Sequence, residues 1–340
     1  MAGITVGVVG LGLGRHFVAA NASTEAVERL IVCDPDAARV TAIRGEYPQI
    51  AAGYSDLDEM IAAEDLDAVN IVTPDHMHRP QVERCLAAGL HVLQTKPLAT
   101  TLEDARAIVR AAEASDRVVM VAHERRFRSV WRAVKALVDE GRLGEIIHVR
   151  SDQVGDKRNQ FAKSPWYASA EAGRTALVGT GIHDVDLVRH LVGRPIESVT
   201  AYSNRLGDME FPASKTTVAL FQFAGGAIGE AMVSYETRWP KGGPRGNLFR
   251  LIGTGGIVVD NQVSFVGQEG WQALPDDPQP IVTGIAGCVE AFVRSIVDGA
   301  PVAIPVRDAF DSVAACVAAD EAAASRCTTT LPSVEECKQT

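Results

Sequence analysis

The sequence has little of what marks a secreted or membrane protein. Only six of its 340 residues are cysteine, and none forms a Cys-x-x-Cys pair, so we expect reduced thiols rather than a disulfide framework. No apolar run reaches the roughly 18 residues of a membrane span. No cationic leader with a small-residue cleavage site precedes the first apolar segment. These absences predict a cytoplasmic protein.

Positive charge is also scarce. Lys and Arg total 33 against 43 Asp and Glu, which gives a net charge of −10. Without a basic block, the chain is not expected to bind nucleic acid or an anionic membrane surface. Its hydrophobic fraction of 46% and charged fraction of 22% are those of an ordinary globular protein. The length allows two domains, each with a core of its own.

A glycine-rich turn follows the first apolar run, residues 4–9. It contains Gly10, Gly12, Leu13 and Gly14, and the residues from 15 onward suit a helix. Residues without Cβ let backbone N–H groups approach a pyrophosphate, and a helix N-terminus favours that negative charge. The third glycine comes one residue too early for the usual G-x-G-x-x-G spacing. A dinucleotide site and a mere tight turn therefore both remain open at this point.

An acidic residue ends the next apolar run, residues 30–33. Asp34 lies about 20 residues beyond Gly14, where a carboxylate can accept hydrogen bonds from adenosine ribose hydroxyls. Because it would repel a 2′-phosphate, Asp34 favours NAD over NADP. The same side chain could instead cap a helix that starts near Pro35, and Arg39 is near enough to weaken the preference. NAD is the expected cofactor.

Apolar runs and helical patterns alternate up to residue 122. Strands are expected at 68–72, 91–94 and 118–122, and helices at 36–46, 58–63, 81–88 and from 100 to about 112. Strands that are apolar throughout and alternate with helices predict a doubly wound parallel sheet with helices on both faces. We therefore expect an N-terminal Rossmann domain over residues 1–122.

The pattern changes in residues 123–340. Helices are expected at 129–140, 183–192, 285–298 and 306–326, and strands at 145–152, 198–205, 216–223, 227–235, 247–253 and 257–260. Strands grouped without intervening helices predict an α+β domain with an open, mostly antiparallel sheet and helices on one face. An apolar open face needs cover, so we expect a homodimer or homotetramer formed through it.

Several motifs occur together in one order. They are Gly10-x-Gly-x-Gly14, Thr73-Pro-Asp-His-Met-His78, Ala88-Gly-Leu-His-Val-Leu-Gln-Thr-Lys-Pro97, Arg126-Phe127 and Gly181-Ile-His-Asp-Val-Asp186. In this combination the chain resembles the Gfo/Idh/MocA family, which includes glucose–fructose oxidoreductase and inositol dehydrogenase. The resemblance implies a Rossmann domain, a C-terminal domain with an open sheet, tightly held NAD(P), and oxidation or reduction of a sugar or cyclitol carbon.

The family's Glu-Lys-Pro motif falls on Thr95-Lys96-Pro97. The resemblance implies that Lys96 lies near the reacting hydroxyl and the nicotinamide. Alcohol oxidation needs a base, and a lysine becomes one where desolvation and a positive nicotinamide ring lower its pKa. Thr73 and Pro74 match the family's turn beneath the nicotinamide. With His78 and Thr95 they complete the residues expected to hold the cofactor.

The family's D-x-G-x-H-x-x-D pattern begins at Gly179. His183 then matches the histidine that hydrogen-bonds the reacting hydroxyl. Asp186, three residues on, could orient its ring and is also expected to contact the substrate. Gly179 replaces the first aspartate, as Thr95 replaces the glutamate. Asp184 is not expected to stand in, because adjacent helical positions point about 100° apart. The lost carboxylate could admit a bulkier substrate or weaken catalysis, and both remain open.

Further candidates for the substrate pocket are polar or aromatic residues, namely Arg126, Lys163, Trp166, Tyr167 and Arg174. The histidines show no recognisable zinc pattern, so no metal is expected. We therefore predict an NAD-dependent oxidoreductase that acts on a sugar, sugar derivative or cyclitol, with Lys96 and His183 handling the proton. Two alternatives stay open: glycoside cleavage by transient oxidation and elimination, and a non-catalytic dinucleotide-binding sensor.

Overall fold

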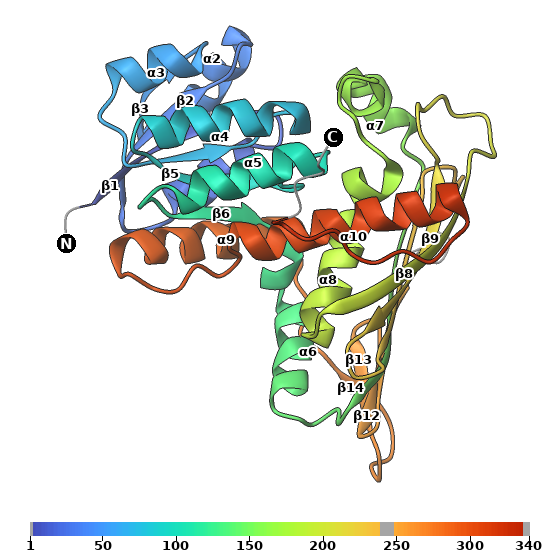
Figure 1. The fold of residues 1–340 in the computed structure, drawn as a ribbon. Helices are drawn as coiled ribbons and strands as arrows, with labels where there is room; N and C mark the ends of the chain where they lie inside the picture. Colours follow the sequence, from blue (N-terminus) through green and yellow to red (C-terminus); the bar gives the residue numbers. More distant parts are fainter. Residues whose placement is uncertain (1–2, 239–247, 336–340) are drawn as a thin grey trace. The chain divides into compact units, whose positions relative to one another are not determined.

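The computed structural model describes residues 3–238 and 248–335, and these fall into two compact units (Figure 1). The first unit comprises the residues up to 99 together with 103–127 and 279–309. The second comprises 100–102, 128–278 and the residues from 310 onward. Each unit thus contains segments from distant parts of the chain. The domain boundary expected from the sequence was instead a single division after residue 122.

A six-stranded sheet forms the centre of the first unit. Its strands are β1 (Ile4–Val9), β2 (Val27–Cys33), β3 (Ile50–Tyr54), β4 (Ala68–Ile71), β5 (His91–Thr95) and β6 (Val119–Ala122). They run parallel in the order β3-β2-β1-β4-β5-β6, which confirms the predicted doubly wound sheet. The strand order reverses between β1 and β4, and such a switch point opens a crevice beyond the carboxyl ends of the strands.

Helices alternate with these strands, as the sequence predicted. They are α1 (Arg15–Ala22), α2 (Ala37–Glu46), α3 (Leu57–Ala63), α4 (His78–Ala87) and α5 (Leu102–Glu113). Asp36 caps α2, since its side chain accepts hydrogen bonds from the backbone N–H groups of residues 38 and 39. The alternative in which Asp34 is that cap is therefore wrong: Asp34 lies two residues too early.

Helix α9 (Pro280–Val297) completes the first unit by packing on α1 and on the short 3-10 helix η2 (Glu124–Phe127). By length and composition alone, α9 could cross a membrane. Its residues Ile285, Val289 and Phe292 are almost completely buried. Packing within the unit therefore accounts for much of its apolar character.

An eight-stranded sheet forms the second unit. Its strands are β7 (Ile146–Val154), β8 (Ile196–Asn204), β9 (Thr216–Phe223), β10 (Ile228–Ser234), β11 (Phe249–Gly253), β12 (Gly256–Val259), β13 (Gln262–Phe265) and β14 (Gln272–Ala273). The order is β14-β13-β12-β11-β7-β10-β9-β8, and every neighbouring pair is antiparallel except β7 with β10. The predicted open, mostly antiparallel sheet is confirmed. The strand expected from residue 247 is described from 249, and residue 247 itself lies outside the described residues.

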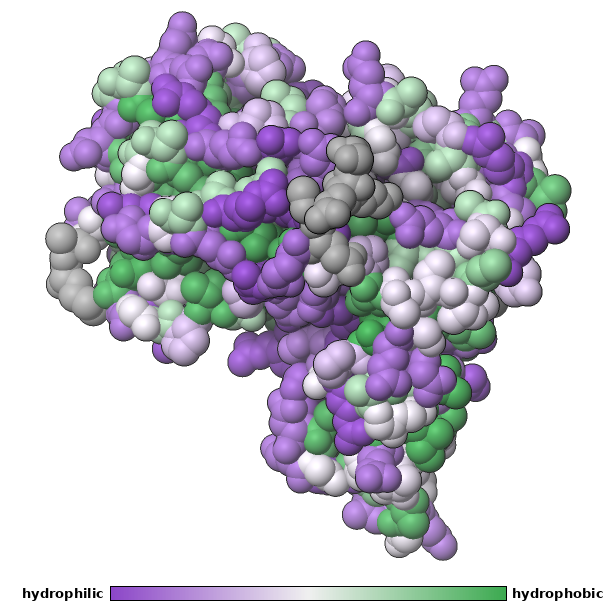
Figure 2. Space-filling view, in the orientation of Figure 1, coloured by the Kyte–Doolittle hydropathy of each residue, from purple (hydrophilic) through white to green (hydrophobic). Residues whose placement is uncertain are grey.

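The two faces of this sheet differ. Helix α8 (Ile182–Val192) packs on β7 and β10, and α6 (Ser129–Asp139) packs on α8. Facing away from α8, the side chains of Tyr202, Leu220 and Ile228 are 75%, 45% and 44% exposed. Figure 2 also shows hydrophobic residues at the surface over β12 to β14. The second unit therefore carries exposed apolar side chains on its sheet.

Candidate active site

The glycine turn after β1 contains two kinds of glycine. Gly10 has a φ of +86°, and a Cβ there would lie 2.4 Å from the Val72 carbonyl oxygen. A Cβ at Gly14 would lie 1.8 Å from the carbonyl oxygen of Gly10. A Cβ at Gly12, in contrast, would meet nothing within 4 Å. The fold requires glycine at 10 and 14, whereas at 12 the missing side chain leaves open space for a ligand.

This open space lies at the start of α1, where Gly14 is the first flanking residue and makes no side-chain cap. Uncapped backbone N–H groups at a helix N-terminus favour an anion. Leu13, which was also predicted to contact the cofactor, is 49% exposed. The turn therefore fits a dinucleotide pyrophosphate, although its spacing departs from the usual motif.

Asp34 fastens this turn to the end of β2. Its Oδ2 accepts a hydrogen bond from the backbone N–H of Leu11 at 2.7 Å, and its Oδ1 accepts one from Asp36 at 2.9 Å. The side chain is buried. Arg39 Nη1 lies 3.6 Å from Asp34 Oδ2, and the arginine side chain is 56% exposed. Asp34 thus has a structural role that the sequence did not reveal, beside the ribose contact predicted for it.

The Thr73-Pro74 turn follows β4 and is held by α4. Thr73 Oγ1 donates a hydrogen bond to Gln81 Oε1 at 2.5 Å. The turn also lies against the glycine loop, because a Cβ on Gly10 would come within 3.2 Å of the Thr73 methyl carbon. Thr73 and Pro74 therefore lie at the same edge of the sheet as the glycine turn, as predicted for a shared cofactor site.

His78 lies beneath this turn. The side chain is completely buried, with Nδ1 2.9 Å from the Pro97 carbonyl oxygen and Nε2 3.3 Å from that of Thr73. Burial lowers the pKa of the imidazole. The predicted contact with the cofactor needs correction, because no surface of the His78 side chain is accessible. Instead, His78 joins the Thr73 turn to the segment after β5.

Lys96 follows β5 directly and is partly exposed. Thr95, the residue in place of the family's glutamate, donates a hydrogen bond from Oγ1 to the Ile71 carbonyl oxygen at 3.3 Å. The Lys96–Pro97 peptide bond is cis. Since β1, β4 and β5 are parallel neighbours, Gly12, Thr73 and Lys96 all lie beyond the carboxyl ends of adjacent strands, as the sequence predicted.

Arg126 was predicted to contact substrate, and its position argues otherwise. The guanidinium is buried within the first unit, and Nη1 forms an ion pair with Asp308 Oδ2 at 2.5 Å. Because the two residues are 182 positions apart, the pairing could not be predicted from local sequence. Arg126 thus connects η2 to the start of α10 (Val306–Ser325).

In the second unit, His183 lies in the first turn of α8 and is partly exposed. A π-helical stretch, η4 (Leu177–Gly181), runs directly into α8, and such stretches occur frequently at functional sites. Gly179 precedes His183 by four positions and therefore shares its face of the helix. The start of α8 thus combines the partly exposed His183 with a glycine, Gly179, one helical turn before it.

Two aspartates of α8 are directed into the protein. Asp184 is buried and its Oδ1 accepts a hydrogen bond from Ser151 Oγ of β7 at 2.6 Å. This direction confirms that it does not replace the carboxylate absent at Gly179. Asp186 is 1% exposed and its Oδ1 accepts a hydrogen bond from Ser312 Oγ of α10 at 2.9 Å. The predicted contact of Asp186 with substrate needs correction, because its side chain has almost no accessible surface.

The guanidinium of Arg174 lies beside Gly179. Its Nη2 donates a hydrogen bond to the Gly179 carbonyl oxygen at 2.6 Å, and a Cβ at 179 would lie 2.5 Å from Nε and Nη2. The guanidinium carbon lies 4.7 Å from the ring centre of Tyr167 and 5.1 Å from that of Trp166. Arg174 thus occupies the space that the missing side chain at Gly179 leaves.

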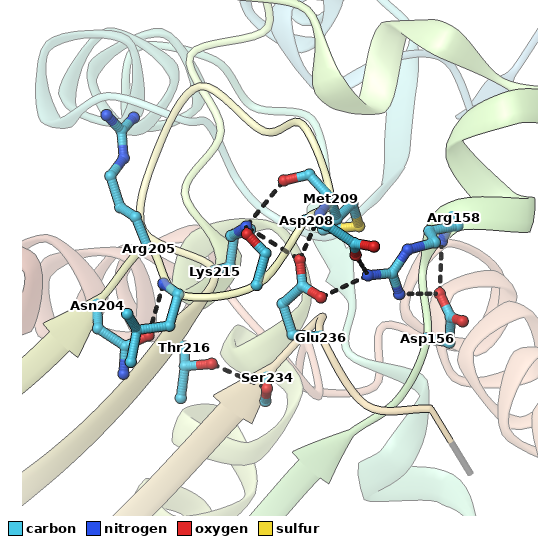
Figure 3. Close-up of polar contacts among 12 residues, drawn as sticks. Asp156, Arg158, Asn204, Arg205, Asp208, Met209, Lys215, Thr216, Ser234 and Glu236 are labelled. Atoms are coloured by element: carbon cyan, nitrogen blue, oxygen red, sulfur yellow. Dashed lines mark hydrogen bonds and ion pairs between the residues drawn. The ribbon is translucent and has the colours of Figure 1, made fainter. Parts of the chain in front are cut away.

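A charged network lies at the start of α7, a few residues before Trp166 and Tyr167 in the sequence (Figure 3). Arg158, the first residue of α7 (Arg158–Lys163), and Lys215 point at the carboxylate of Glu236 from opposite sides. Lys215 is buried, and its Nζ lies 2.9 Å from Glu236 Oε1. Because these residues are far apart in sequence and unremarkable singly, sequence reasoning missed them.

A surface cavity of about 420 Å³ in the first unit is lined by Val118, Val119 and Pro305 among others. It contains none of the predicted site residues. Within residues 3–238 and 248–335, no three His, Cys, Asp or Glu side chains form a group that could hold a metal ion.

Two family models match the chain. The model described as an oxidoreductase family with an NAD-binding Rossmann fold (GFO_IDH_MocA) matches residues 4–123. The model described as the GFO/IDH/MocA C-terminal domain matches residues 131–259. The first match includes the glycine turn and Lys96. The second includes His183 and most of the open sheet.

The chain is similar to inositol 2-dehydrogenase 2 of Saccharopolyspora erythraea, with 29% identity over 63% of this chain and 61% of that protein. D-Apiose dehydrogenase of Rhizobium rhizogenes is 30% identical over 61% of this chain and 58% of its own. 1,5-Anhydro-D-fructose reductase of Ensifer adhaerens is 28% identical over 67% and 70%. The match thus spans about three fifths of the length of the first of these relatives.

Solved structures share the fold over nearly the whole chain. Levoglucosan dehydrogenase in complex with NADH and levoglucosan has a TM-score of 0.86 at 23% identity, covering 97% of this chain and 100% of that one. An oxidoreductase from Agrobacterium radiobacter in complex with NAD+, L-tartaric acid and magnesium has a TM-score of 0.85 at 23% identity, covering 96% and 98%.

Proposed function

Because the chain belongs to the Gfo/Idh/MocA family of NAD-binding oxidoreductases, we propose that it moves a hydride between nicotinamide and a secondary alcohol or ketone carbon. The substrate would be a sugar, a sugar derivative or a cyclitol. One observation carries the proposal: the bare backbone of Gly12, the Thr73 turn and Lys96 lie beyond the carboxyl ends of three adjacent parallel strands. Ligands of open α/β sheets bind at this edge.

The first unit contains the family's NAD-binding Rossmann domain. Gly12 and the start of α1 would hold the pyrophosphate, and Thr73 and Pro74 would support the nicotinamide. The carboxylate of Asp34, supported by the N–H groups of Leu11 and Asp36, favours ribose hydroxyls over a 2′-phosphate. Bound NAD would supply the hydride acceptor for oxidation and the donor for reduction.

Lys96 and His183 would handle the proton. In oxidation, the carbon loses its hydride while the hydroxyl loses its proton to a base, and a C=O bond forms. A partly exposed lysine directly after β5 suits that base. His183, partly exposed at the entrance of α8, would hydrogen-bond the same hydroxyl and help to move its proton.

NADH absorbance with a panel of sugars and cyclitols tests this proposal. Lys96→Ala should lower kcat by about 100-fold or more while leaving the Kd for NADH nearly unchanged. Lys135→Ala, a change in a lysine of α6 that pairs with Asp139, is the matched control and should keep full activity. Unchanged turnover in Lys96→Ala would contradict the assignment.

The same assay separates the two alternatives. Glycoside cleavage by transient oxidation and elimination would release product without net NADH formation. A dinucleotide-binding sensor would bind NADH and a polyol without turnover.

We also propose that two or four copies associate in the cytoplasm through the open sheet face. Tyr202, Leu220 and Ile228 are exposed there and would be covered by a second copy. Leu220→Glu should lower the molar mass measured by light scattering. A monomeric wild type would contradict this assembly.

A further inference from the structure

Tyr235 joins the end of β10 to the helical stretch that carries His183. Its side chain is 1% exposed. The hydroxyl oxygen lies 2.8 Å from Thr180 Oγ1 and 3.3 Å from the Ala176 carbonyl oxygen, and it is hydrogen-bonded to both. Ala176 directly precedes η4, and Thr180 lies within it. One buried hydroxyl group therefore spans the π-helical turn that runs into α8.

Thr180 connects this contact to His183. The two residues are three positions apart on one continuous helical stretch, so they are neighbours on its surface. A π-helical turn contains more residues than an α-helical turn, and each residue of a helix adds about 100° of rotation. The geometry of η4 therefore determines how the first turn of α8 is directed, and Tyr235 bonds to this stretch at two points.

Two further aromatic residues hold the ring of Tyr235. Its ring centre lies 5.5 Å from that of Phe161 in α7 and 5.3 Å from that of Phe211, with interplanar angles of 85° and 77°. Such edge-to-face pairs are a favoured arrangement of aromatic rings. Phe211 belongs to the loop between β8 and β9 and also stacks on Phe161 at 5.7 Å. The ring is thus packed independently of the bonds that its hydroxyl group makes.

The neighbouring Glu236 fixes the same two segments (Figure 3). Its Oε2 pairs with Arg158 of α7, and its Oε1 accepts a hydrogen bond from the backbone N–H of Met209 at 2.6 Å. Lys215 Nζ lies 2.9 Å from the same Oε1 and donates a hydrogen bond to the Gly207 carbonyl oxygen at 2.8 Å. Because Glu236 follows Tyr235 directly, these contacts fix the backbone from which the tyrosine reaches η4.

We propose that Tyr235 is a positioning residue for the dehydrogenase reaction: its hydroxyl group holds the turn before α8, so that His183 stays directed at the reacting hydroxyl of the substrate. The inference rests on the proposed function. Since its own side chain is buried, Tyr235 acts through Thr180 and the first turn of α8. The contacts of Glu236 keep the tyrosine in place.

Tyr235→Phe tests the inference, because it removes one oxygen atom and keeps the packed ring. With NAD and a panel of myo-inositol, levoglucosan and D-glucose, kcat should fall about 10-fold or more. KM and the Kd for NADH should each change less than about 3-fold. Tyr202→Phe removes the hydroxyl group of a tyrosine of β8 that is 75% exposed. It is the matched control and should keep full activity.

The partner hydroxyl group provides a second pair of variants, which carries the same test if Tyr235→Phe does not fold. Thr180→Val removes that hydroxyl group at nearly constant volume and should lower kcat as Tyr235→Phe does. Thr180→Ser keeps the hydroxyl group and should retain most of the activity. A lower melting temperature with unchanged kcat in both Tyr235→Phe and Thr180→Val would mean that the bond only stabilises the fold, and would overturn the inference.

A double variant tests whether Tyr235 acts through His183. If it does, Tyr235→Phe should change kcat less than about 2-fold in a His183→Ala background, because the residue that it positions is already absent. Losses that multiply in the double variant would show that the two residues act independently, and this result contradicts the inference.

NMR of protein with 13C-labelled histidine gives a readout that needs no turnover, and His183→Ala identifies the His183 signal. Tyr235→Phe keeps the aromatic ring and its ring current, so a shifted His183 signal reports the altered turn. Tyr202→Phe should leave the signal in place. An unshifted signal in Tyr235→Phe overturns the inference while the dehydrogenase function stands. If NADH binds but no member of the panel is oxidised, the proposed function fails, and the control of His183 by Tyr235 then survives only if the signal shifts.

Discussion

Nδ1 of the His78 imidazole lies 2.9 Å from the carbonyl oxygen of Pro97, and both residues are buried. The first residue of α4 is thereby joined to the residue that follows Lys96. Gln94 completes the contact, because its Nε2 donates to the Leu98 carbonyl oxygen at 2.9 Å and lies 3.1 Å from His78 Nδ1. Buried polar groups joined in this way fix the backbone on both sides of the proposed base.

His78→Phe should therefore impair catalysis through Lys96. The loss of a buried hydrogen bond is expected to lower the free energy of unfolding by about 1–3 kcal/mol and to lower kcat at least about 10-fold. The Kd for NADH should change little. His91→Phe is the control: its ring accepts a hydrogen bond from the Val118 N–H at 2.8 Å at the opposite end of β5. A kcat equally reduced in both variants would mean that His78 has only a structural role.

Gly12→Ala should separate ligand binding from folding. Because a Cβ at 12 meets nothing within 4 Å, we expect an unchanged melting temperature and an affinity for NADH about 10-fold weaker or worse. Gly14→Ala should instead destabilise the protein, since its Cβ would lie 1.8 Å from the Gly10 carbonyl oxygen. Isothermal titration and thermal unfolding check the pair. Normal NADH binding by Gly12→Ala would contradict the proposal that this turn holds the pyrophosphate.

Asp34→Asn should change the choice of cofactor. The neutral amide no longer repels a 2′-phosphate, and Arg39 Nη1, 3.6 Å from the present carboxylate, becomes available to one. The ratio of NADPH to NADH affinity should rise about 10-fold or more. Asp139→Asn, a change in an exposed carboxylate of α6 that pairs with Lys135, is the control and should leave the ratio unchanged. Equal ratios in the wild type and Asp34→Asn would show that Asp34 does not face the ribose.

Asp320 should make stability depend on pH. Burial raises the pKa of its carboxyl group from 3.8 to about 6, and Thr175 Oγ1 donates a hydrogen bond to it at 2.6 Å. Between about pH 4 and 6 the folded protein keeps a proton that the unfolded chain has released. Through Asp320, stability is therefore highest below this window and falls as the pH rises through it.

Urea unfolding from pH 4 to pH 8 checks this expectation. Asp320→Asn should be more stable than the wild type above pH 6, by about 1–3 kcal/mol, and this difference should shrink toward pH 4. Asp311→Asn, in which the changed carboxylate is exposed and pairs with Arg189, should show no such gain. A difference that does not vary with pH would contradict the raised pKa.

The fold could be predicted where burial leaves a strong pattern. The strands β1, β4 and β6 are mostly apolar and almost completely buried, because both faces of the sheet are covered. β3, with the sequence Ile-Ala-Ala-Gly-Tyr, was missed because it is short and partly exposed. The residues of β14 are exposed and likewise gave no signal. These two strands are held by backbone pairing more than by burial.

Only those parts of the candidate site that are marked by a local sequence motif could be predicted. The glycine turn, the Thr73 turn and Lys96 are each marked by their own neighbours in the sequence. The ion pair of Arg126 with Asp308 and the contact of Asp186 with Ser312 join residues more than 100 positions apart. Only the folded chain shows that these two predicted substrate contacts have other partners. The roles assigned to Lys96 and His183 stay predictions.

Packing of α9 on α1 has a consequence for how the protein is made. Phe17 and Val18 of α1 are buried, yet α9 is encoded near the opposite end of the chain. During translation, the dinucleotide-binding unit is incomplete until α9, which follows the whole eight-stranded sheet in the sequence, has left the ribosome. Until then the apolar surface of α1 that α9 covers is exposed, and chaperones or neighbouring chains can bind it.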